Sequence, residues 1–157
     1  MEEQNFTISR VQPCGENRHA VFFTYPREMI NYHYERQLVP VVHGEIVDEA
    51  TAASNPDTEW RPDPRIQHTL TLEADSYGNV LKEAAIGYGR RHRDSSLPLP
   101  VDQDKQAKTL TTYIENRVTN QIDEVAAHSG DYRTPLSCEA RTYELTGCDF
   151  SWNEDPV

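Results

Sequence analysis

The stretch RIQHTLTLEADSYGNVLKEAAIGYG, residues 65–89, carries the clearest structural signal in this chain. In its first half the side chains alternate with a period of two, which predicts a β-strand with one face toward a core. The expected inward set is Ile66, His68, Leu70, Leu72 and Ala74. The second half alternates again after a turn. The stretch therefore predicts an antiparallel β-hairpin.

The turn of this hairpin is the segment SYGN, residues 76–79. Glycine and asparagine tolerate the positive φ angles that tight turns require. We therefore expect Tyr77, Gly78 and Asn79 to shape the turn. His68 lies on the apolar face, where a core histidine with one hydrogen bond is the usual outcome.

Weaker strand signals lie on both sides of this hairpin, at residues 6–11, 20–25, 29–36, 109–120 and 139–147. Pro26 is expected to interrupt pairing after the second of them, because proline cannot donate to a β-ladder. Short helical segments are predicted at 46–53 and 102–108. The predicted fold class is mainly β: antiparallel hairpins or a meander, forming a sheet or shell segment with long loops and little helix.

The domain organisation that follows has one β-rich region and two flanking segments. We expect an N-terminal extension at 1–19, a β-rich region at 20–147 with a loop insertion at 44–64, and a loose tail at 148–157. Apolar residues make up 36% of the chain and the mean hydropathy is −0.77. Two explanations fit so thin a core: partial disorder, or membership of a larger assembly that supplies the missing burial.

The charge of the chain disfavours two classes of partner. The net charge is −11 and the sequence pI is near 4.9, which opposes binding to nucleic acid or to an anionic membrane surface. No apolar run approaches the roughly 20 residues that span a bilayer. The start MEEQNFTISR does not have the pattern of a secretory signal peptide. The three cysteines do not form a disulfide framework or a zinc motif.

The candidates for chemistry are few. His33 and Glu35 share the polar face of one predicted strand, where a solvated face is the simpler reading and a hydrolase site the rival one. The only basic cluster contains Arg90, Arg91 and Arg93, which we expect to pair with the chain's own acids or with a neighbouring acidic surface. No nucleotide-binding, metalloprotease or nucleophile-elbow motif is present. We therefore expect no catalytic, cofactor-binding or metal-binding residue.

A second function class stays open at this point. Tyrosines lie in or beside the predicted strands and are suited either to cross-strand packing or to a sugar-binding platform. They are Tyr32, Tyr34, Tyr77, Tyr88, Tyr113 and Tyr143. The alternative to a shell segment is therefore a free-standing β-sandwich-like module that binds a glycan or a protein partner.

Four ordered blocks of the chain resemble a known family. They are FFTYPREMINYHYER (22–36), DPRIQHTLTLEADSYGNVLKEAAIGYGRR (63–91), TLTTYIENRVTN (109–120) and YRTPLSCEARTYELTG (132–147). Together they resemble the middle-to-C-terminal region of the B component of bacterial insecticidal toxin complexes, the Tc toxins. That family is related to Rhs/YD-repeat proteins, and the D-x-Y-G-N-V turn at 75–80 is similar to a YD-repeat turn.

The resemblance implies a structural role. In the family, a β-propeller of the B component docks on the pore-forming A component, and the remainder forms with the C component a hollow β-sheet cocoon around a toxic effector. This segment would lie in the cocoon wall or at its junction with the propeller, with other regions of the cocoon as partners. It would be made in the bacterial cytoplasm and be secreted or released as part of the complex.

The sequence also departs from the family pattern. The propeller, the Rhs core with its self-cleaving aspartates and the effector have no counterpart in these residues, so their activities are not carried over. The segment 39–60 separates blocks that we expect to be closer in the family, and the residues after 147 leave the pattern.

Overall fold

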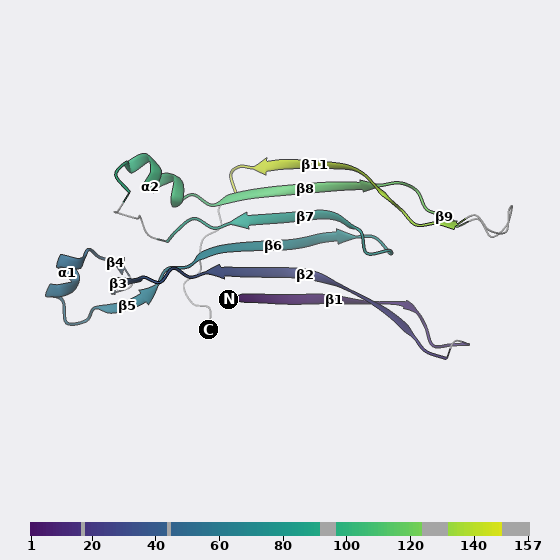
Figure 1. The fold of residues 1–157 in the computed structure, drawn as a ribbon, viewed down its shortest axis with the longest axis horizontal. Coiled ribbons are helices and arrows are strands. Elements are labelled where there is room, and N and C mark those ends of the chain that lie inside the picture. Colours follow the sequence, from purple (N-terminus) through teal and green to yellow (C-terminus); the bar gives the residue numbers. More distant parts are fainter. Residues whose placement is uncertain (17, 44, 92–96, 124–131, 149–157) are drawn as a thin grey trace.

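The predicted hairpin lies at the centre of a six-stranded antiparallel sheet (Figure 1). The structure is a computed structural model that describes residues 1–16, 18–43, 45–91, 97–123 and 132–148. In spatial order the sheet contains β1 (Glu2–Gln12), β2 (Val21–His33), β6 (Arg65–Ala74), β7 (Val80–Gly87), β8 (Leu110–Val118) and β11 (Ser137–Leu145). A two-residue pair, β9 (Ile122–Asp123) and β10 (Tyr132–Arg133), extends beyond β8 and β11. The mainly β, antiparallel prediction is confirmed.

The β6–β7 hairpin keeps the predicted register only in part. His68 lies opposite Ile86 and Leu70 opposite Ala84, as the alternation requires. Leu72, predicted to face inward, has no partner in β7 and is 55% exposed. The register shifts between Thr71 and Glu73, so that Leu72 is the extra residue of a β-bulge. That part of the inward-facing prediction is wrong.

The expected interruption of pairing at Pro26 occurs on one side of β2 only, and the strand itself continues through the proline. Pairing of β2 with β1 skips Arg27, and Pro26 lies opposite Phe6. Because Met1 and Tyr32 exchange both backbone hydrogen bonds, odd-numbered residues of β1 bond toward β2. The Phe6–Pro26 pair is then a non-hydrogen-bonded one, which needs no N–H from proline. Pairing of β2 with β6 begins only at Glu28, beyond the proline.

The segment 44–64, expected to be a loop, contains regular structure. It contributes to a separate three-stranded sheet in the order β4 (Glu45–Ile46), β3 (Leu38–Val42) and β5 (Glu59–Pro62). It also contains α1 (Glu49–Ser54), which begins at Asp48 because that side chain accepts a hydrogen bond of 2.7 Å from the Thr51 N–H. The loop interpretation is therefore wrong, whereas the short helix predicted at 46–53 corresponds to α1. The strands are too short for their alternation to be visible in the sequence.

The expected extension at 1–19 and the helix at 102–108 also have defined places. β1 occupies most of the first segment and forms one edge of the main sheet. The predicted helix corresponds to α2 (Pro100–Gln106) in the connection between β7 and β8. Of the predicted tail, residues 149–157 lie outside the described residues.

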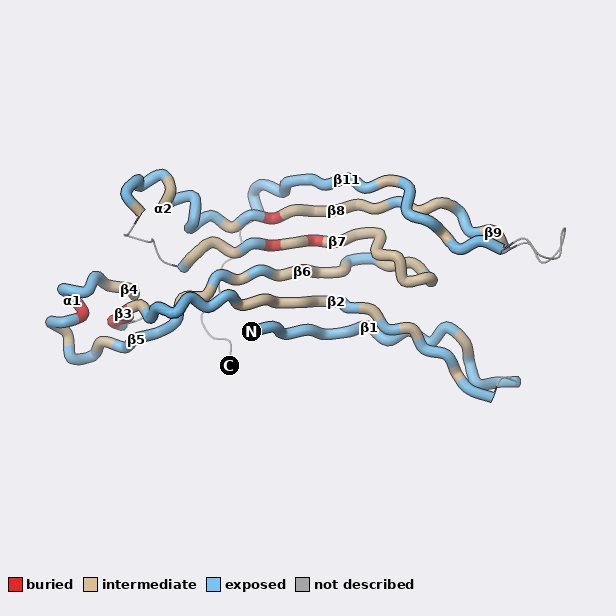
Figure 2. Tube along the Cα trace, viewed as in Figure 1, coloured by how far each residue is buried: buried red, intermediate tan, exposed pale blue. Residues whose placement is uncertain are grey.

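The main sheet is a single layer with little core. Within the described residues, contacts between elements join neighbouring strands of one sheet, and otherwise only α1 and β3. Buried residues are few and lie in β3, where the last three residues are buried, and at isolated positions in α1, β7 and β8 (Figure 2). The accessible surface is 12066 Å², whereas a folded monomer of 18.0 kDa exposes about 8,000 Å². The thin core expected from composition is thus a property of the architecture.

Candidate functional site

The turn between β6 and β7 is organised by Asp75. Its Oδ1 accepts hydrogen bonds of 2.9 Å from the backbone N–H groups of Tyr77 and Asn79, and its Oδ2 accepts one of 2.8 Å from the Asn79 side chain. Burial raises the pKa of this carboxyl, but the hydrogen bonds from Asn79 and Tyr77 outweigh burial and leave the pKa below its ordinary value. Gly78 adopts a φ of 83°, in the left-handed region. The charged acceptor in this turn is thus a residue that the sequence analysis did not select.

The same turn touches β2. A Cβ built on Gly78 would lie 1.9 Å from Cζ of Phe23, so the phenyl ring occupies the space that any other residue at position 78 would need. The Phe23 ring in turn stacks on Tyr25, with centroids 5.8 Å apart. Glycine is therefore required here by both conformation and contact.

Arg90 joins three segments where the main sheet meets the small sheet. Its guanidinium forms an ion pair with Glu35, which follows β2, and lies 3.6 Å from Oδ2 of Asp63, which follows β5. The side chains of Arg90 and Asp63 are only 13% and 8% exposed. Glu35 also forms an ion pair with Arg65, with 3.1 Å between the nitrogen and the oxygen. The backbone N–H of Arg90 donates a hydrogen bond to the carbonyl of Gln106, the last residue of α2. This charged junction fixes the small sheet to the end of the main one.

The other two arginines of the predicted basic cluster follow Arg90 closely in the sequence. Arg91 lines the adjacent pocket, and Arg93 lies outside the described residues. Charge pairing by these two residues stays a prediction.

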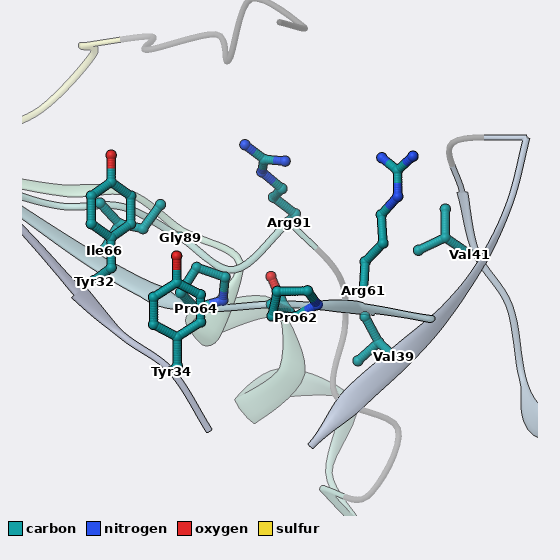
Figure 3. Close-up of a pocket in the computed structure, with 11 residues that line it drawn as sticks. Tyr32, Tyr34, Val39, Val41, Arg61, Pro62, Pro64, Ile66, Gly89 and Arg91 are labelled. Carbon is teal, nitrogen blue, oxygen red and sulfur yellow. The ribbon is translucent and has the colours of Figure 1, made fainter. Parts of the chain in front are cut away.

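A pocket of about 260 Å³ opens beside the charged junction, between the two sheets (Figure 3). Tyr32 and Tyr34 lie on one side of it with ring centroids 6.3 Å apart and their hydroxyls pointing the same way. The guanidinium groups of Arg61 and Arg91 point to that same side. Burial, and then the charge of Glu3, raise the pKa of Tyr32. The pocket therefore combines aromatic surface with cationic side chains at its mouth.

His68 makes two hydrogen bonds rather than the single one expected. One ring nitrogen lies 3.1 Å from the Tyr88 hydroxyl and the other 2.7 Å from Oε1 of Glu28. Burial, and then the negative charge of Glu28, raise the pKa of Tyr88, which keeps its hydroxyl protonated. The three side chains link β2, β6 and the end of β7 across one face of the sheet.

The His33–Glu35 pair does not have the surroundings of a hydrolytic site. The pocket between the two sheets is lined by other residues, and Glu35 is engaged by Arg90 and Arg65. Among the described residues, no group of three or more His, Cys, Asp or Glu side chains is placed to hold a metal ion. None of the described helices is long and apolar enough to cross a membrane.

The protein is built from a single-layer, antiparallel β-sheet into which a small second sheet is inserted. Residues 58–130 match the family described as "Insecticide toxin TcdB middle/C-terminal region". Over these residues the chain is similar to that region of the TcdB family, and the resemblance to the Tc toxin B component is confirmed. The link to Rhs/YD-repeat proteins stays a prediction.

Two solved structures share the fold. A crystal structure of TcdB2-TccC3-Cdc42 matches 92% of this chain with a TM-score of 0.59 and 19% identity. A crystal structure of TcdB2-TccC3 without its hypervariable C-terminal region matches 90% with a TM-score of 0.50 and 22% identity. This chain spans 6% of the length of each matched chain. No curated protein matches the chain.

Proposed function

We propose that this chain is a non-enzymatic wall segment of a Tc-toxin-like B component, contributing to a β-sheet cocoon that encloses a toxic effector. The observation that carries the proposal is the open single-layer sheet. Its outer strands, β1 and β11, each have one partner, and no described helix or strand covers its faces. Such a sheet gains its missing burial when neighbouring strands and layers surround it.

The partners in this proposal are the other regions of a B and C component assembly. Both structural neighbours are titled as TcdB2-TccC3 complexes, which supports a place beside further toxin chains. The chain would be made in the bacterial cytoplasm and released as part of the assembled complex. It needs neither nucleic acid nor insertion into a membrane for this role.

The alternative function, a free-standing β-sandwich-like module for a glycan or protein, is less well supported. A sandwich requires a second sheet stacked about 10 Å from the first. The small three-stranded sheet is attached at one end of the main sheet rather than across its face (Figure 1). Four tyrosines form two separate neighbouring pairs on the sheet rather than one concave platform: Tyr32–Tyr34 and Tyr113–Tyr143.

A replacement experiment tests the wall role. The segment of TcdB2 that matches this chain is exchanged for the 157-residue chain, and the product is co-expressed with TccC3. A wall segment should restore a co-purifying complex in which the enclosed region resists added protease. The matched control carries Gly78→Trp, which removes the Phe23 contact, and it should lose both properties. Failure of the unaltered replacement to assemble, while the native TcdB2 assembles, would reject the proposal.

A second measurement separates the two functions in the isolated chain. A wall segment predicts slow amide exchange in β6, β7 and β8, fast exchange in β1 and β11, and binding of a hydrophobic dye to the open sheet. A self-contained module predicts protection in all six strands and no dye binding.

A further inference from the structure

The free edge of β1 has an unusual composition for an exposed strand. Since odd-numbered residues of β1 bond toward β2, the even-numbered residues direct their backbone N–H and C=O groups outward. Those residues are Glu2, Gln4, Phe6, Ile8 and Arg10. From position 4 to position 9 the strand reads QNFTIS, without a charge or a proline. The middle of the strand therefore lacks the charges and prolines that normally prevent an edge strand from pairing, and its charges lie near its two ends, at Glu2, Glu3 and Arg10.

The side chains on this edge add apolar surface to the free backbone. Phe6 is 55% exposed and Ile8 is 68% exposed. Phe22 of β2 lies opposite Arg10 and is exposed on the same face of the sheet. A large apolar patch next to an unpaired backbone edge is a surface suited to receive another β-strand.

The opposite edge of the sheet is protected. β11 carries Glu139, Arg141 and Glu144 within its nine residues, and Arg141 is held by Glu139 at 2.8 Å. Closely spaced charges of this kind disfavour edge-to-edge association. The contrast makes β1 the edge at which a partner strand is expected.

We infer that β1 pairs in antiparallel orientation with β1 of a second copy of this chain, about a two-fold axis through Phe6. Opposite residues must lie on the same face, so even positions pair with even positions. With Phe6 opposite itself, Glu2 of each copy lies opposite Arg10 of the other, and Gln4 lies opposite Ile8. The pairing creates two oppositely charged cross-strand pairs and no like-charged pair. A strand whose charges complement its own reversed sequence fits a closed, isologous dimer.

A register shifted by two residues is the nearest competitor. It places Thr7 opposite itself and Phe6 opposite Ile8, but Glu2 then faces Gln12 and both Glu–Arg pairs are lost. Position 6 and position 7 therefore distinguish the two registers.

Cysteine cross-linking tests the pairing in the full 157-residue chain. Cys14, Cys138 and Cys148 are exposed thiols that could form competing disulfides, so each is first changed to serine. In this background Phe6→Cys should give a disulfide-linked dimer on mild oxidation, because hydrogen-bonded pairs have Cα atoms about 5.5 Å apart. Thr7→Cys should remain monomeric under the same conditions. Cross-linking at position 7 alone, or at neither position, overturns the inference.

A charge exchange tests the same pairing without a covalent bond. Arg10→Glu places a glutamate opposite Glu2 at both ends of the interface. The two like-charged pairs should raise the dimer dissociation constant by about ten-fold in sedimentation equilibrium. The double change Glu2→Arg with Arg10→Glu restores both pairs and should restore the original constant. Arg141→Glu, on the far edge, is the matched control and should have no effect.

The dimer experiments and the replacement experiment test the dimer and the wall role separately. A chain that is monomeric at all concentrations, or a double variant that fails to recover, overturns the dimer. Neither result bears on the wall role, in which the same edge would receive a neighbouring strand of the assembly. Failure of the replacement experiment, in contrast, leaves the dimer standing.

Discussion

The phenyl ring of Phe23 in β2 lies against Gly78 in the β6–β7 turn, where a Cβ at position 78 would come within 1.9 Å of the ring. These residues are far apart in sequence, and the contact holds the end of the central hairpin against the neighbouring strand. Gly78 also has a φ of 83°. Two independent physical reasons therefore keep this position a glycine.

Gly78→Ala should lower the free energy of unfolding by about 2–4 kcal/mol, because it adds left-handed strain to the overlap with Phe23. Urea denaturation followed by circular dichroism measures the change. Gly147→Ala is the matched control: φ is 78° there, but nothing lies within 4 Å of the added Cβ. It should cost only about 1 kcal/mol. Equal effects at the two positions would contradict the Phe23 contact.

Asp75→Asn should destabilise the chain at neutral pH and have little effect in acid. The folded-state pKa of Asp75 is lowered, so its carboxylate contributes stability above the unfolded-state pKa of about 3.9. That contribution is lost as the pH falls from this value through the lower folded-state pKa. Urea midpoints of the two proteins should therefore differ at pH 7 and converge as the pH falls through the folded-state pKa of Asp75. A difference that does not depend on pH would exclude the charge of Asp75 as its cause.

Arg90→Met should cost about 2–4 kcal/mol, because it leaves the nearly buried Asp63 without its cation. Hydrogen exchange should also become faster around Asp63 and Glu35, where the small sheet joins the main one. Arg61→Met removes an exposed pair with Glu59 and should cost less than about 0.5 kcal/mol. In a double-mutant cycle, Asp63→Asn should recover part of the loss caused by Arg90→Met.

Tyr88→Phe should cost about 1 kcal/mol, because it removes the hydroxyl that lies 3.1 Å from the His68 ring. Tyr132→Phe, at an exposed position, should leave the unfolding midpoint unchanged. The His68 ring proton signals in NMR should shift in the first variant and not in the second. An unshifted His68 spectrum in Tyr88→Phe would show that the hydroxyl is not its partner.

The sequence was sufficient to predict the central hairpin, because a period of two is a local property that survives in any half-covered sheet. It failed at Leu72, since a bulge shifts the register without changing the alternation that precedes it. At Pro26 the prediction holds toward β6, where pairing does not extend past Glu28, and fails toward β1, because the missing N–H falls on a non-hydrogen-bonded pair.

Of the charged junction, only the cationic residue could be predicted from the sequence. The basic cluster that contains Arg90 stands out in an acidic chain, but Glu35 and Asp63 are two acids among many. Their selection depends on the small sheet, which brings the end of β5 back to the end of β2. Asp75, in contrast, had a local signal: an aspartate followed by Ser-Tyr-Gly-Asn is suited to an Asx-type turn.

The small sheet leaves and rejoins the main one at neighbouring points. His33, the last residue of β2, lies opposite Arg65, the first of β6, so the chain departs and returns across a single strand spacing. The intervening segment is thus a cassette: its length and content are free to change in evolution or by engineering while the register of the six long strands is kept. A short connection of two or three residues between His33 and Arg65 would convert the two strands into a simple hairpin.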